Sequence, residues 1–246
     1  MILIGQYDSP FVRRVGIALM LYGLAFEHRP WSAFGDADKI RPYNPLTRVP
    51  TLVLDDGEVL TESHLMLDYL DSLVAADRRM FPTGEPARHQ ALRIAALATG
   101  LGDKSVSLFY EKRLHENASD LWVGRCRTQI ESVLAALDAD RAARPGAYWF
   151  GDRIGHADVA VAAVLRFRRS ASGPGSAGRL PGARGSRRAV GGIARLSGDL
   201  PALHPAGLNA SALPASHRIS AAPACRLRRT KSRPFRQPLA GVSPGC

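Results

Sequence analysis

Cysteine is scarce in this chain. Cys126, Cys225 and Cys246 form no Cys-x-x-Cys pair and no even set of the kind that builds a disulfide framework. We therefore expect no disulfide, no metal site and a reducing, cytoplasmic compartment. Arg13 and Arg14 precede an apolar run, as in a secretory signal, but no small-residue cleavage site follows. We expect neither a signal nor a membrane association.

Acidic and aromatic residues almost disappear from the last third of the chain. The 246 residues carry a net charge of +11, but residues 1–165 carry −3 and residues 166–246 carry +14. After Arg169, Asp199 is the sole acidic residue and Phe235 the sole aromatic one. A segment of this composition cannot bury enough apolar surface to offset the entropy of ordering it. The 46% hydrophobic content should therefore form its packed core in the first two thirds.

Local patterns in the first eighty residues predict a β-α-β unit, an irregular loop and a β-β-α unit. Ser9 and Pro10 begin a helix, because serine caps free amides and proline is tolerated at the first helical position. That helix should reach Leu21 or Tyr22 and end at Gly23. The expected strands lie in MILIG, AFEHRPW, PTLVLDD and GEVLTES. A second amphipathic helix begins in ESHLMLDYLDSL, with apolar positions that include Leu65, Leu67, Leu70 and Leu73.

The ordered set SPFVRR, NPLTRVPTLVLDDG and ESHLMLDYL resembles the glutathione S-transferases, and in particular small bacterial glutathione-transferase-like proteins that use a serine. The resemblance covers about residues 1–168. It implies an α/β plus all-α fold: a thioredoxin-like, glutathione-binding domain at 1–76, a linker at 77–86 and an incomplete helical-bundle domain at 87–168. We expect the Arg/Pro/Gly/Ser/Ala-rich tail at 169–246 to be disordered.

The expected helical domain contains two long helical patterns followed by GDRIGHADVAVAAVLRF. The last segment resembles the buried helix of the family, in which Asp158 folds back on the first turn as a capping box. Gly155 stands where the family usually has serine or threonine, and glycine caps less well.

The resemblance makes Ser9 the candidate catalytic residue. A thiol becomes a good nucleophile when it loses its proton, and a helix N-terminus together with a hydroxyl donor stabilises the thiolate. Ser9 would donate to the sulfur of bound glutathione rather than act as the nucleophile. Two alternatives stay open: Ser9 only caps the helix, or a neighbouring group is the donor.

Four further residues would hold glutathione. The family's proline at position 50 is cis, and Val49 would pair through its backbone with the cysteinyl part of the ligand. Ser63 suits the γ-glutamyl carboxylate and Glu62 the amino group. The alternatives are an ordinary trans Pro50 that opens an edge strand, and plain helix capping by Thr61, Glu62 and Ser63.

Other polar residues near these motifs are expected to be structural. Arg13 and Arg14 would form a solvated helix face, with contact to the ligand as the alternative for either of them. His64 and His156 would be surface or capping residues rather than catalysts. The electrophile would bind against the first long helix. Its pocket is expected to include Phe11, Leu101, Ser105, Leu108 and Phe109.

The resulting hypothesis is a cytoplasmic, homodimeric transferase that uses glutathione as a co-substrate, with no permanently bound cofactor. Two other classes stay open: a non-catalytic binding or regulatory protein, and a glutathione-dependent reductase, which Ser9 in place of cysteine disfavours. RLRR and TKSRPFR would suit a nucleic-acid-binding arm, but we do not expect nucleic acid as a partner. We predict instead that a frameshift replaced the native end of the chain, which would leave the apolar stretch 159–165 without packing partners.

Overall fold

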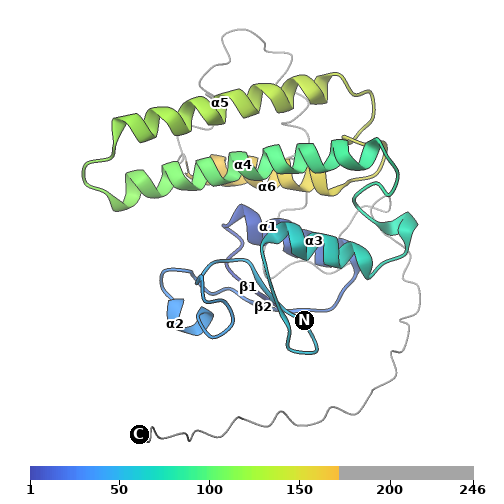
Figure 1. Cartoon of the computed structure of the whole chain (residues 1–246), viewed down its shortest axis with the longest axis horizontal. Coiled ribbons are helices and arrows are strands. Elements are labelled where there is room, and N and C mark those ends of the chain that lie inside the picture. The colour runs from blue at the N-terminus through green and yellow to red at the C-terminus, as the bar shows by residue number, and fades with distance from the viewer. Residues whose placement is uncertain (172–246) are drawn as a thin grey trace, which may run out of the picture.

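The computed structural model describes residues 1–171. Its first part is a four-stranded mixed sheet in the order β2-β1-β3-β4, in which β1 is parallel to β2 and antiparallel to β3, and β3 is antiparallel to β4. The strands are β1 (Ile2–Ile4), β2 (Glu27–Arg29), β3 (Thr51–Val53) and β4 (Val59–Thr61). The predicted β-α-β and β-β-α units are both present, with the helices on one face of the sheet (Figure 1).

Helix α1 (Pro10–Tyr22) begins and ends where its capping residues predict. Ser9 Oγ accepts the backbone N–H of Val12, and the first helical residue is a proline. Gly23 ends the helix in the left-handed conformation, at φ 68°, which glycine adopts without a steric penalty.

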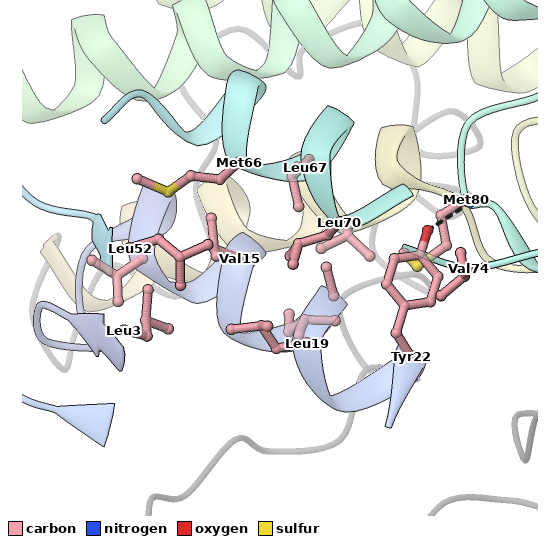
Figure 2. Packing of buried hydrophobic residues seen from close by; sticks show 14 of the residues in the cluster. Leu3, Val15, Leu19, Tyr22, Leu52, Met66, Leu67, Leu70, Val74 and Met80 are labelled. Atoms are coloured by element: carbon pink, nitrogen blue, oxygen red, sulfur yellow. Dashed lines mark hydrogen bonds between the residues drawn. The ribbon is translucent and has the colours of Figure 1, made fainter. Parts of the chain in front are cut away.

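Helix α3 (Ser63–Ser72) packs beside α1 over the sheet. Figure 2 shows Leu3 and Leu52 of the sheet facing Val15 and Leu19 of α1, with Met66, Leu67 and Leu70 of α3 above them. Burial of these side chains holds the helices on the sheet, since each Å² of apolar surface removed from water stabilises the folded state by about 25 cal/mol. Two of the four apolar positions expected on α3 are not part of this core, because Leu65 and Leu73 are 63% and 44% exposed.

Two short helices were not predicted. The expected irregular loop after β2 contains α2 (Ala37–Ile40), whose Ile40 is buried against the outer face of the sheet. The linker contains a 3₁₀ turn, η1 (Ala76–Arg78).

The second part is a bundle of α4 (Ala87–Leu114), α5 (Asp120–Ala142) and α6 (His156–Ala171). Figure 1 shows α4 and α5 side by side, with α1 and α3 lying between this bundle and the sheet. Helix α6 packs against both α4 and α1. The fold class is therefore as expected, a thioredoxin-like domain followed by a helical domain, whereas the exact domain boundaries stay predictions.

The apolar stretch 159–165 does not lack packing partners, contrary to expectation. Every residue in it is buried, because α1 covers one side of α6 and α4 another. The disordered tail, the nucleic-acid-binding arm and the frameshift were predicted for a segment that, from residue 172 onward, lies outside the described residues. Within residues 1–171, no helix is both long and apolar enough to span a membrane, and no cluster of three metal-ligating side chains occurs.

Candidate functional site

The strand registers bring three sequence motifs to one edge of the sheet. Ile4, the last residue of β1, pairs with Thr51, the first residue of β3, which in turn pairs with Thr61, the last residue of β4. The residues that follow β1, precede β3 and follow β4 must therefore share that edge. SPFVRR, the Val49–Pro50 dipeptide and the Glu62–Ser63 dipeptide are those residues.

Ser9 caps α1 and keeps its hydroxyl hydrogen available. Its Oγ accepts the Val12 N–H at 3.4 Å, while its own N–H donates to Asp8 Oδ1 at 2.8 Å and to Gln6 O at 3.2 Å. Capping uses a lone pair of the hydroxyl oxygen and leaves the O–H free to donate. Within residues 1–171 no acceptor for that hydrogen is found, and Ser9 is only partly buried. The capping interpretation of Ser9 and a donor role are therefore compatible.

Val49 presents an open backbone edge. The Val49–Pro50 peptide bond is cis, so the alternative of an ordinary trans proline is wrong. Across the described part of the chain, neither the N–H nor the C=O of Val49 has a hydrogen-bond partner. Exposed backbone groups of this kind are suited to pairing with an extended peptide.

Gly5 allows this edge to pack against α1. It follows β1 at φ +133°, and a Cβ added there would lie 2.5 Å from Val12 Cγ2 and 2.8 Å from Val49 Cβ. No other residue fits between these two side chains. Gly5 was not predicted to have a role, although its position at the end of a strand was a signal for such a close approach.

Glu62 and Ser63 occupy the start of α3. Glu62 has a left-handed backbone, at φ 67°, and its carboxylate Oε1 accepts from Arg48 Nη1 at 3.3 Å. It makes no side-chain capping bond, so capping by Glu62 is not its role here. The Ser63 side chain is buried, and its hydroxyl has no hydrogen-bond partner in the described residues. The first-turn amides and this hydroxyl form a donor set typical of anion binding at a helix N-terminus.

Arg13 and Arg14 do not form a solvated helix face, so that expectation is wrong. They are 8% and 1% exposed, because α3, α4 and α6 cover α1. Burial lowers the pKa of Arg13 to about 10 and that of Arg14 to about 9, which leaves both charged at neutral pH. No carboxylate in residues 1–171 forms an ion pair with either of them.

Both histidines make specific hydrogen bonds, and His156 is not a surface residue. The His156 side chain is fully buried, and its Nε2 donates to Asp71 Oδ1 at 2.8 Å. His64 is exposed, as expected of a surface residue, and its Nδ1 lies 3.3 Å from Arg14 Nη2 and its Nε2 lies 2.9 Å from Thr99 Oγ1.

Asp158 closes the start of α6. Its Oδ2 accepts the Gly155 N–H and its Oδ1 accepts the Trp149 N–H, each at 2.9 Å. The structure also explains the unusual cap, because a Cβ on Gly155 would lie 2.9 Å from the carbonyl oxygen of Met80. Serine or threonine at this position would collide with the backbone of the linker.

The residues expected to form the electrophile pocket separate into two groups. Leu101 and Ser105 are buried in the bundle, and the Ser105 hydroxyl donates to the Leu101 carbonyl at 2.7 Å. These two residues therefore do not line an open surface. Phe11 lies against Gly102, and Leu108 is partly buried at the margin of the bundle core.

Phe109 belongs to an aromatic row that was not predicted from the sequence. Its ring contacts Tyr110 and Phe167, with centroid separations of 5.4 and 6.0 Å. Tyr110 in turn contacts Phe34 of the loop after β2 at 5.0 Å. Because these rings come from three separate segments, no local pattern in the sequence indicates that they meet.

Comparison with known proteins identifies the family. Residues 3–78 match the family model for the glutathione S-transferase N-terminal domain, and residues 120–190 match that for the C-terminal domain. The chain is 30% identical over 178 residues to the uncharacterized GST-like protein YibF of Escherichia coli (strain K12), an alignment that covers 70% of this chain and 85% of YibF. The chain belongs to the glutathione S-transferase family.

Two further relatives show what the family contains. A maleylacetoacetate isomerase of Pseudomonas aeruginosa is 30% identical over 164 residues, which cover 62% of this chain and 74% of the isomerase. A glutathione S-transferase of Methylobacterium radiotolerans, solved in complex with glutathione sulfonate, is similar with a TM-score of 0.69 at 29% identity, over 82% of this chain and 90% of that one.

Proposed function

We propose that this chain is a glutathione transferase that activates the thiol of glutathione for attack on a hydrophobic electrophile. The observation that carries the proposal is the convergence, at one edge of the sheet, of three sets of unpaired hydrogen-bonding groups. These are the Ser9 hydroxyl, the Val49 backbone and the first turn of α3 at Ser63. A tripeptide with one thiol and one γ-glutamyl carboxylate has groups that complement all three.

Each set would bind a different part of glutathione. Val49 N–H and C=O would pair with the cysteinyl backbone as an added strand does. Ser63 and the free amides around it would hold the γ-glutamyl carboxylate. Glu62, held by Arg48 at 3.3 Å, would accept from the ligand's amino group.

Ser9 would then act on the sulfur. Its O–H and the N-terminus of α1 both favour a negative charge at that point, so the pKa of the bound thiol falls and more of it is thiolate at neutral pH. The thiolate electron pair forms the new C–S bond, and the leaving group departs with the pair that had bound it to carbon. Ser9 neither gains nor loses a covalent bond in this step.

The electrophile would bind beside the aromatic row of Phe34, Phe109, Tyr110 and Phe167. Neighbouring rings of the row have centroids 5.0 to 6.0 Å apart, and such a cluster of aromatic side chains favours contact with a flat, apolar molecule. This feature supports an aromatic or otherwise hydrophobic electrophile over a small polar one.

Binding and activity assays on the purified full-length chain distinguish the transferase from the non-catalytic binding protein and from the reductase. We expect calorimetric binding of glutathione, and thioether formation when an aromatic electrophile is added. Binding without turnover of a panel that includes maleylacetoacetate would favour the non-catalytic class, and reduction of a mixed disulfide without thioether formation would favour the reductase. Absence of glutathione binding would overturn the proposal.

We also propose a cytoplasmic homodimer. The exposure of Leu65 on α3 and of Leu73 just after it supports an apolar contact with a second copy, since these side chains stay largely uncovered among the described residues. Light scattering at micromolar concentration should give twice the chain mass of 26.5 kDa.

A further inference from the structure

His64 joins three helices directly behind the candidate carboxylate-binding turn. It follows Ser63 in the first turn of α3, and its ring nitrogens contact Arg14 of α1 and Thr99 of α4. The Arg14–His64–Thr99 chain therefore crosses from the sheet domain to the helical bundle.

The two hydrogen-bond partners determine the protonation state and tautomer of His64. Arg14 can only donate, so His64 Nδ1 must be the acceptor at 3.3 Å. Thr99 donates its hydroxyl hydrogen to the carbonyl of Ala95 at 3.0 Å, or to that of Ala96 at 3.1 Å, so its oxygen accepts from His64 Nε2–H at 2.9 Å. A neutral imidazole with its proton on Nε2 satisfies both contacts, and no other form does.

Arg14 has an unusual environment that makes this contact important. Its guanidinium is buried, its Nε and Nη1 have no partner, and within residues 1–171 no carboxylate neutralises it. The hydrogen bond to His64 is therefore the one hydrogen bond that the guanidinium makes to the residues that the structure describes. Losing a partner of a buried charged group is more costly than losing a surface contact.

We infer that His64 is a positioning residue for glutathione, an inference that rests on the proposed function. By engaging Arg14 and Thr99, the ring holds the first turn of α3 in place, so that Ser63 and its neighbouring amides keep the geometry that receives the γ-glutamyl carboxylate. His64 does not touch the thiol, which lies at Ser9. Its loss should therefore weaken glutathione binding and leave the chemical step intact.

The test compares four variants of the full-length chain by calorimetry and steady-state kinetics. His64→Leu should raise the Kd and KM for glutathione about five- to thirtyfold, as expected for two lost hydrogen bonds, with kcat at saturating glutathione within about twofold. His64→Gln keeps an acceptor and a donor and should recover most of the affinity. Thr99→Val removes one contact at nearly constant shape and should cost about threefold, with no further loss when combined with His64→Leu.

His115→Leu is the matched control, because among residues 1–171 the His115 ring hydrogen-bonds only to Glu111, at the far end of α4, and its loss should change nothing. Unchanged glutathione affinity in His64→Leu, a fall in kcat instead of affinity, or additive losses in the double variant would overturn the inference while the proposed function stands. If His64→Leu does not fold, Thr99→Val and His64→Gln decide by the same criteria. If the parent chain itself binds no glutathione, both the proposed function and this inference fail.

Discussion

The carboxylate of Asp71 and the imidazole of His156 form a buried hydrogen bond of 2.8 Å between α3 of the sheet domain and the first residue of α6. The same carboxylate accepts from the hydroxyl of Tyr22 and from the N–H of Phe81 at 3.1 Å. The Tyr22 oxygen also accepts the N–H of Met80 at 2.8 Å (Figure 2). One polar network therefore ties both domains to the linker, and its removal should destabilise the whole chain.

Tyr22→Phe should lower the free energy of unfolding by about 1–3 kcal/mol, because it removes the hydroxyl that donates to Asp71 and leaves the buried Met80 N–H with only a long contact of 3.5 Å to Asp71 Oδ1. Tyr69→Phe is the matched control, since the Tyr69 hydroxyl has no hydrogen-bond partner in the described part of the chain. Urea unfolding measures both variants. Equal midpoints for the two would show that the network contributes nothing.

Stability should fall as the pH drops from about 7 to 5. Burial lowers the pKa of His156 below its usual 6.5, and burial together with Arg14 lowers that of His64 to about 4. The unfolded chain therefore binds more protons than the folded one below about pH 6.5, so each group contributes stability that is present above that pH and lost below it. His156→Gln should show a shallower loss between pH 7 and 5 than the parent, whatever its absolute stability, and an unchanged slope would contradict this. Urea unfolding at several pH values provides the comparison.

Gly155→Ser should destabilise the chain by about 1–3 kcal/mol, although serine is the better N-cap by general preference. The reason is the Met80 carbonyl oxygen, 2.9 Å from the position that a Cβ would occupy. Thermal unfolding shows whether the gain from the better N-cap or the loss from the clash with the Met80 carbonyl is larger. A variant more stable than the parent would mean that the linker can move away from α6.

Local patterns predicted the elements that have local causes. The caps at Ser9 and Gly23 define α1, and the order of strands and helices followed from apolar periodicity. What could not be predicted depends on distant segments: Arg13 and Arg14 have the charge pattern of a surface, yet other helices cover them. The aromatic row at Phe109 and the burial of Leu101 in the bundle core also depend on segments that are distant in the sequence, so neither could be predicted locally.

Ser9→Ala should reduce turnover by about ten- to a thousandfold and change glutathione affinity only a few-fold, because the donor acts on the thiolate while other groups hold the peptide. It should also cost about 1 kcal/mol of stability through the lost cap. Ser119→Ala is the matched control: Ser119 caps α5 by accepting the Trp122 N–H at 3.3 Å, outside the candidate site. That variant should lose similar stability and no activity. Equal kinetics for Ser9→Ala and the parent would remove Ser9 from the mechanism.

The pKa of the thiol of bound glutathione tests the role of Ser9 most directly. It can be measured by following the ultraviolet absorbance of the thiolate as the complex is titrated. The parent complex should titrate well below the value of about 8.5 of a free cysteine thiol, and the Ser9→Ala complex should titrate close to that value. A bound thiol with the same pKa in both complexes, or one that is not lowered in the parent, would contradict activation of glutathione by Ser9.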